Sequence, residues 1–139
     1  MTSFQSAASE QGRQFAQQCD LLLQQSGFEL RRPVLLREVG VEIDREAVGP
    51  NGRTIWFEYK GSIQGVRPGL MRTDTVKKAI ANGALLSAVP DHPPYVVLTS
   101  HLPTNGAALA MLSAARQLGY FDDVICIYDP AQTARLRGL

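Results

Sequence analysis

The sequence has only two cysteines, almost no net charge and no long apolar run, and each of these shortages narrows the class of protein. Cys19 and Cys126 lie in apolar-periodic segments without a CxxC partner, so we expect buried thiols in a reducing cytoplasm, with a disulfide left open. Apolar runs such as those at 95–98 and 124–127 are far shorter than the roughly 18 residues of a membrane span. The N-terminal segment has no basic stretch followed by an apolar one, so we expect neither a secretory signal nor a membrane partner.

The net charge of +1 over 139 residues argues against a strongly basic coat for nucleic acid. Any surface that binds nucleic acid would therefore depend on local clusters of lysine and arginine. Hydrophobic residues make up 45% and charged residues 19% of the chain, which is typical of a globular protein rather than a disordered one. A chain of this length closes one hydrophobic core, so we expect a single domain over residues 1–139.

Hydrophobic periodicity predicts a chain of interspersed helices and strands. Apolar residues at three- and four-residue steps predict a helix over 4–26, which Gly27 ends. Strands near 34–39, 41–48 and 54–62 are expected to form an antiparallel meander, with Asn51-Gly52 favouring a tight hairpin turn. The second half is expected to contain a helix over 76–89, a buried strand over 95–100, a helix over 107–120 and a buried strand over 123–129. This order predicts an α/β fold with a mixed central sheet flanked by helices.

Strand alternation brings three ionisable side chains together in this meander. Residues two apart on a strand point to the same side of a sheet. Asp44 therefore faces away from Val41 and Ile43, and Glu58 and Lys60 share one face of the return strand. If the turn at 49–52 pairs the two strands, Asp44, Glu58 and Lys60 become neighbours. Charges in the middle of an apolar sheet need an explanation, because burying an unpaired charge is costly.

A divalent cation would explain this arrangement. Mg²⁺ prefers one or two carboxylates together with water and phosphate oxygens, so we expect Asp44 and Glu58 to bind it with the backbone carbonyl of Tyr59, and Mn²⁺ to substitute. The metal would activate a water molecule. Lys60, protonated beside two carboxylates, would stabilise the charge of the transition state. The alternative is a solvated ion-pair cluster on the open face of the sheet.

Asp44 followed by Glu58-Tyr59-Lys60 resembles the motif of the PD-(D/E)XK nuclease superfamily, an acidic residue on one strand and (D/E)-x-K on the next. The expected order of elements is similar to the restriction-endonuclease-like αβββαβ core of that superfamily, with the last helix and strand as a C-terminal αβ extension. One departure is Ile43, which stands before Asp44 in place of proline. The resemblance implies metal-dependent hydrolysis of DNA phosphodiester bonds, either structure-specific as in junction resolvases or of the restriction or repair type. In resolvase-like members a glutamate of the first helix joins the site, which implies a catalytic and metal-binding role for Glu10.

Side chains that follow the second carboxylate are candidates for binding the DNA backbone, where contacts to phosphate dominate affinity. They are Ser62, Arg67, Arg72, Lys77 and Lys78. Cutting both strands symmetrically needs two active sites, so we expect a homodimer. The alternative function is a catalytically inactive module on the same scaffold, which would bind DNA or protein as a subunit of a larger defence or mobile-element complex.

Overall fold

The computed structural model describes residues 3–62 and 69–139, with the backbone alone for residues 3–9. Its elements are α1 (Ser3–Gln25), β1 (Glu29–Leu30), β2 (Val34–Leu36), β3 (Val41–Ile43), β4 (Arg45–Val48), β5 (Thr54–Lys60), a 3₁₀ helix (Gly69–Met71), α2 (Thr73–Leu86), β6 (Tyr95–Thr99), α3 (Gly106–Gln117), β7 (Asp123–Cys126), α4 (Pro130–Thr133) and a second 3₁₀ helix (Ala134–Gly138). The helices and the buried strands of the second half confirm the expected elements, with boundaries shifted by a few residues. The short β1 and the C-terminal helices were not predicted.

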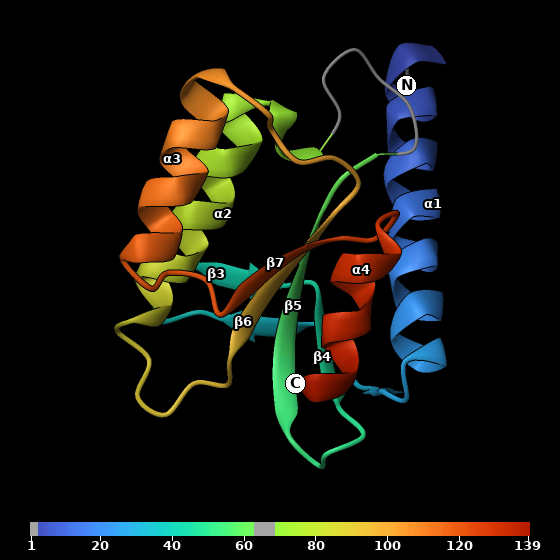
Figure 1. Ribbon diagram of the computed structural model, residues 1–139, viewed down its shortest axis with the longest axis vertical. Coiled ribbons are helices and arrows are strands. Elements are labelled where there is room, and N and C mark those ends of the chain that lie inside the picture. Colours follow the sequence, from blue (N-terminus) through green and yellow to red (C-terminus); the bar gives the residue numbers. More distant parts are fainter. Residues whose placement is uncertain (1–2, 63–68) are drawn as a thin grey trace.

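A five-stranded mixed sheet forms the centre of the fold (Figure 1). Its strand order is β1-β4-β5-β6-β7, and β2 and β3 form a separate two-stranded sheet. Neighbours β1, β4 and β5 run antiparallel, whereas β5, β6 and β7 run parallel. Helices α2 and α3 pack on one face, while α1 and the C-terminal segment pack on the other. The expected α/β fold, with a mixed sheet flanked by helices, is confirmed.

The periodicity of α1 decides which side of the helix meets the sheet. Phe15, Cys19 and Leu23 recur at four-residue steps and are buried against Phe57 of β5. Gly27 follows the helix with a φ of +91°, the left-handed conformation that suits glycine after a helix. Both cysteines are free, although Cys126 is only half-buried. The helix predicted from this periodicity is therefore confirmed.

The expected strand over 41–48 is wrong, because the chain breaks at Asp44 into β3 and β4. Strand β3 pairs with β2, and β4 pairs with β5. Val41 and Ile43 pack in the core on the side of α2, whereas Ala47 packs on the side of α1. One regular strand would have placed all three on the same side. The break lets each segment bury its apolar residues in a different layer, and it leaves Asp44 at the junction.

The turn between β4 and β5 is wider than the tight Asn-Gly hairpin that was expected. The Gly49 amide donates to the Arg53 carbonyl at 2.8 Å, and Gly52 has a φ of +80°. Asn51 does not adopt a positive φ. Its side-chain amide instead donates to the backbone carbonyls of Arg137 and Leu139 at 3.3 and 3.2 Å. The turn therefore also holds the C-terminal segment against the sheet.

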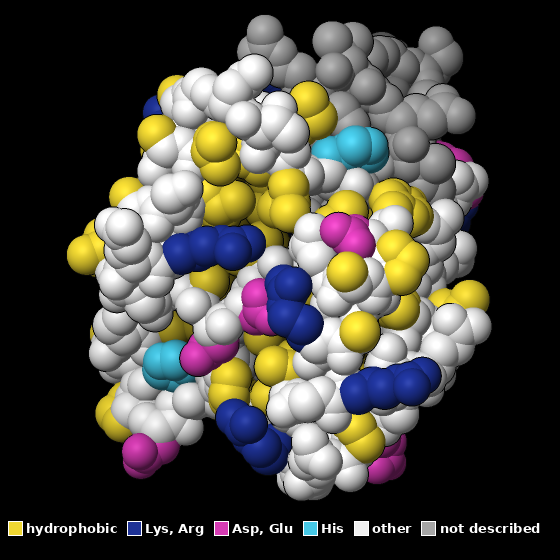
Figure 2. Space-filling model, viewed as in Figure 1, with side chains coloured by type: hydrophobic (Ala, Val, Ile, Leu, Met, Phe, Trp, Pro, Cys, Tyr) yellow, Lys and Arg dark blue, Asp and Glu magenta, His cyan; other side chains and the backbone are white. Residues whose placement is uncertain are grey.

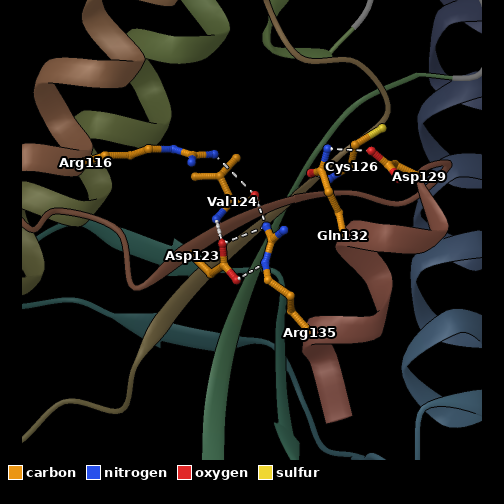
Figure 3. A network of polar contacts seen from close by, with 7 residues as sticks. All are labelled: Arg116, Asp123, Val124, Cys126, Asp129, Gln132 and Arg135. Carbon is orange, nitrogen blue, oxygen red and sulfur yellow. Dashed lines mark hydrogen bonds and ion pairs between the residues drawn. The ribbon is translucent and has the colours of Figure 1, made fainter. Parts of the chain in front are cut away.

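Side chains cover the edge of the sheet at β7 (Figure 3). Arg116 and Arg135 both donate to the Val124 carbonyl, and Arg135 forms a bidentate ion pair with Asp123 at 3.0 Å. The Cys126 amide donates to the side-chain carbonyl of Gln132 at 2.8 Å. These contacts occupy backbone groups that an exposed edge strand would otherwise offer to another chain.

No helix in the described part of the chain is long and apolar enough to cross a membrane.

Candidate active site

Asp44 and Glu58 come together where β4 begins. The register of β4 and β5 ends with Arg45 opposite Phe57, so Asp44 and Glu58 are the residues next along the two chains. The backbone amide of Tyr59 donates to Oδ2 of Asp44 at 2.7 Å, which holds this carboxylate beside β5. Asp44 also raises the pKa of Glu58, through hydrogen bonding and through its charge. The structure therefore brings together the two acids that the sequence singled out.

Glu58 is a buried carboxyl with unusual partners. Glu58 is only 2% exposed. Its Oε2 accepts hydrogen bonds from Nδ2 of Asn82 at 2.6 Å and from the Tyr95 hydroxyl at 3.2 Å. Burial, followed by the hydrogen bond and the charge of Asp44, raises the pKa of Glu58 to about 8. The charge of Lys60 and the hydrogen bond from Asn82 act in the opposite direction on that pKa.

The raised pKa of Glu58 favours a proton on this carboxyl at neutral pH. A buried carboxylate beside a second carboxylate is costly to ionise without a compensating charge. A cation can supply that charge in place of the proton. The carboxyl pair therefore fits a divalent metal ion by its chemistry.

Lys60 ends β5 two residues after Glu58 and is half-buried. Its positive charge acts to lower the pKa of Glu58. Trp56, at the same strand parity, packs on the α2 side, whereas Phe57 and Tyr59 pack on the α1 side. The expected sharing of faces along β5 is therefore confirmed.

Tyr59 links the site to α1 on the other side of the sheet. Its hydroxyl donates to Asp20 at 2.6 Å, and Arg45 donates to both oxygens of the same carboxylate at 3.1 and 2.8 Å. The backbone amide of Tyr59 thus holds Asp44, and the Tyr59 side chain is itself held by the hydrogen bond from its hydroxyl to Asp20. The role of its backbone carbonyl as a metal ligand stays a prediction.

Glu10 is not joined to the carboxyl pair by any contact of the described residues. Glu10 lies on α1, which packs on one face of the sheet. Glu58 contacts Asn82 of α2, which packs on the opposite face. The Glu10 carboxylate accepts hydrogen bonds from Arg13 and Gln14 of its own helix, and the bond from Arg13 lowers its pKa. In the part of the chain that the structure describes, no three acidic, histidine or cysteine side chains converge on one point.

The candidate DNA-binding residues lie in two different settings. Ser62 is half-buried, its amide donates to Oγ of Ser100 at 3.2 Å, and its hydroxyl donates to Gln11 at 3.4 Å. Arg72 directly precedes α2, and Lys77 and Lys78 lie on it; all three are exposed. Arg67 lies outside the described residues. On the face in Figure 2, lysine and arginine side chains stand apart with hydrophobic ones between them, so the described part of this face has no continuous basic surface.

Sequence reasoning missed Asn82 and Tyr95. Both carried a signal, since Asn82 is a polar residue inside an apolar helix and Tyr95 opens a wholly buried strand. A buried tyrosine hydroxyl generally needs a hydrogen-bond partner. Their shared partner, Glu58, lies on a third element, and local sequence does not encode that meeting.

Comparisons with protein-family models, with curated proteins and with solved structures found no match for this chain.

Proposed function

We propose that this protein is a metal-dependent endodeoxyribonuclease of the PD-(D/E)XK type, with Asp44, Glu58 and Lys60 as its catalytic residues. The observation that carries the proposal is the buried Glu58 carboxyl on β5, with Asp44 held on the adjacent Tyr59 amide and Lys60 two residues further along the strand. The mixed sheet flanked by helices, in which β5 pairs antiparallel with β4 and parallel with β6, supports this proposal. The proximity of Asp44 to β5 through the Tyr59 amide also supports it.

The residues divide the work of phosphodiester hydrolysis between them. Asp44 and Glu58 would hold the metal, each through an oxygen that the protein leaves available. A bound Mg²⁺ or Mn²⁺ supplies an activated water molecule and positive charge at the phosphate. Lys60 adds a fixed positive charge next to the pair, where negative charge develops on the phosphate oxygens during attack. Tyr59 and Asp20 keep Asp44 in place from the far side of the sheet.

DNA is the proposed substrate, and the start of α2 is the proposed contact with its backbone. Arg72, Lys77 and Lys78 are exposed there and would contact phosphates in a salt-dependent, sequence-independent way. Symmetric cutting of two strands, whether at a junction or in a duplex, would involve a homodimer.

A cleavage assay with the full chain tests this proposal. Wild type, Lys60→Ala and the control Arg53→Ala are incubated with linear, supercoiled, single-stranded and four-way-junction DNA in Mg²⁺ or Mn²⁺, and in chelator. Arg53 is an exposed cation in the turn before β5, so its removal should leave cleavage unchanged. Loss of one preorganised charge should lower the rate of Lys60→Ala by about 10²–10³. Equal cleavage by wild type and Lys60→Ala would contradict the mechanism.

A non-catalytic binding module on the same scaffold is the second candidate, and the burial of Glu58 favours it. A carboxyl that is 2% exposed, with one oxygen occupied by Asn82, can serve simply as part of a polar core. DNA binding by the wild type, without cleavage of any substrate in either metal, would support this second candidate and remove the first.

A further inference from the structure

Two elements far apart in the sequence converge on one oxygen of Glu58. Asn82 reaches Oε2 from the middle of α2 at 2.6 Å, and the Tyr95 hydroxyl reaches it from the start of β6 at 3.2 Å. The Tyr95 hydroxyl also lies 3.3 Å from the carbonyl of Ala79, so its single hydrogen is shared between two acceptors. Asn82 is therefore the stronger of the two donors to this oxygen.

These contacts restrict how the Glu58 carboxyl can turn. Rotation about its last bond would carry Oε2 away from the Asn82 amide until a half-turn brought the equivalent Oε1 into its place, so a fixed donor holds the plane of the carboxylate. With Oε2 bonded to Asn82 and Tyr95, Oε1 is the oxygen that these donors leave available. Asp44 is restricted in the same way, because its Oδ2 accepts from the Tyr59 amide. Each carboxylate thus has one oxygen that these donors do not occupy.

We propose that Asn82 is a positioning residue of the metal site, which holds the Glu58 carboxylate so that it presents one oxygen to a cation shared with Asp44. The inference rests on the proposed function. It implies that the site takes a single divalent ion, since each carboxylate has one oxygen to give and no third acid converges there among the described residues. Residues that orient metal ligands in this way commonly change metal affinity by about 10–100-fold when they are removed.

Calorimetric titration of the full chain with Mn²⁺, together with the Mn²⁺ resonance spectrum, tests the role of Asn82. Asn82→Ala removes the donor, and Asn105→Ala is the matched control because Asn105 is exposed and makes no side-chain cap contact. We expect one Mn²⁺ per wild-type chain with the spectrum of an isolated ion. Asn82→Ala should bind it at least about tenfold more weakly, and Asn105→Ala should match the wild type. A purely structural role would lower the melting temperature of Asn82→Ala without changing the affinity of its folded form.

Tyr95→Phe is the second variant and keeps the inference testable if Asn82→Ala does not fold. It removes only the hydroxyl, with Tyr120→Phe as control, and we expect a weaker Mn²⁺ affinity than in the wild type. Wild-type affinity in Asn82→Ala, or in Tyr95→Phe where Asn82→Ala does not fold, would overturn the positioning role and leave the proposed function standing. A coupled pair of Mn²⁺ ions in the wild type would overturn the single-ion arrangement that positioning implies. Absence of Mn²⁺ binding by the wild type, with or without DNA, would overturn the nuclease proposal and this inference together.

Discussion

Glu58→Gln should stabilise the metal-free protein at alkaline pH, because it replaces a proton-dependent interaction by a permanent one. An amide has the shape of a protonated carboxyl. Its oxygen can accept the hydrogen bond from Asn82, and its NH₂ group can donate to Asp44, as the shared proton does in the wild type. The substitution therefore preserves the packing and removes the titration.

The magnitude follows from the pKa of Glu58. Burial and the neighbouring Asp44 raise this pKa from 4.5 to about 8, so the folded protein keeps a proton that the unfolded chain releases. The stabilisation from that proton is complete below about pH 4.5 and is lost as the pH rises through about 8. At about 1.4 kcal/mol for each pKa unit, the wild type should lose on the order of 5 kcal/mol over this window from Glu58 alone.

Denaturant unfolding in chelator from about pH 5 to about pH 9 measures this effect through the free energy of unfolding. Wild type and Glu58→Gln should be similar at the acidic end, and the variant should be more stable by several kcal/mol at the alkaline end. Glu42→Gln is the matched control, because Glu42 is an exposed carboxylate on β3. It should follow the wild type at every pH. Parallel curves for wild type and Glu58→Gln would refute the reasoning, since Glu58 would then not hold a buried proton.

Three further predictions concern the metal ligand, the DNA surface and the core. Asp44→Ala should weaken Mn²⁺ binding and cleavage together. It should also raise the melting temperature of the metal-free protein at alkaline pH, because it removes a like charge beside Glu58. Unchanged Mn²⁺ affinity by calorimetry would exclude Asp44 as a ligand. Replacing Arg72 and Lys77 together by alanine should weaken binding to all DNA sequences and flatten the dependence of affinity on salt; full affinity with the same salt slope would place the DNA surface elsewhere. Phe15→Ala should lower the free energy of unfolding by about 3–5 kcal/mol, because Phe15 is buried between α1 and the sheet. Urea denaturation with the exposed Gln17→Ala as control checks this value, and a loss below about 1 kcal/mol would contradict the packing.

Sequence periodicity was reliable wherever a single element meets a single layer. The four-residue steps of Phe15, Cys19 and Leu23 predicted the buried side of α1, and the alternation in β5 predicted that Glu58 and Lys60 point away from Phe57. Both patterns are local, because the helix and strand repeats alone determine which residues share a side. The approach of Asp44 to Glu58 followed in turn from the hairpin between β4 and β5.

The strand predicted from periodicity was wrong at Asp44, because the residues before it pack in one layer and those after it in another. Val41, Ile43 and Ala47 share one parity, so the alternation of apolar residues does not separate β3 from β4. The separation arises because Val41 and Ile43 are buried against α2, while Ala47 is buried against α1. Only the packed arrangement of both helices makes a break more favourable than a continuous strand.

The chain's own pattern therefore determined the elements, their buried sides and the meeting of Asp44 with Glu58. Tertiary structure alone decided the surroundings of that pair: Asn82 and Tyr95 arrive from α2 and β6, and the Glu10 carboxylate stays with Arg13 on α1. The physical reason is the distance along the chain over which each kind of interaction acts. Repeats of two and of 3.6 residues act between near neighbours in the chain, whereas the partner of a buried polar group depends on how distant elements pack and which donors they bring within about 3 Å.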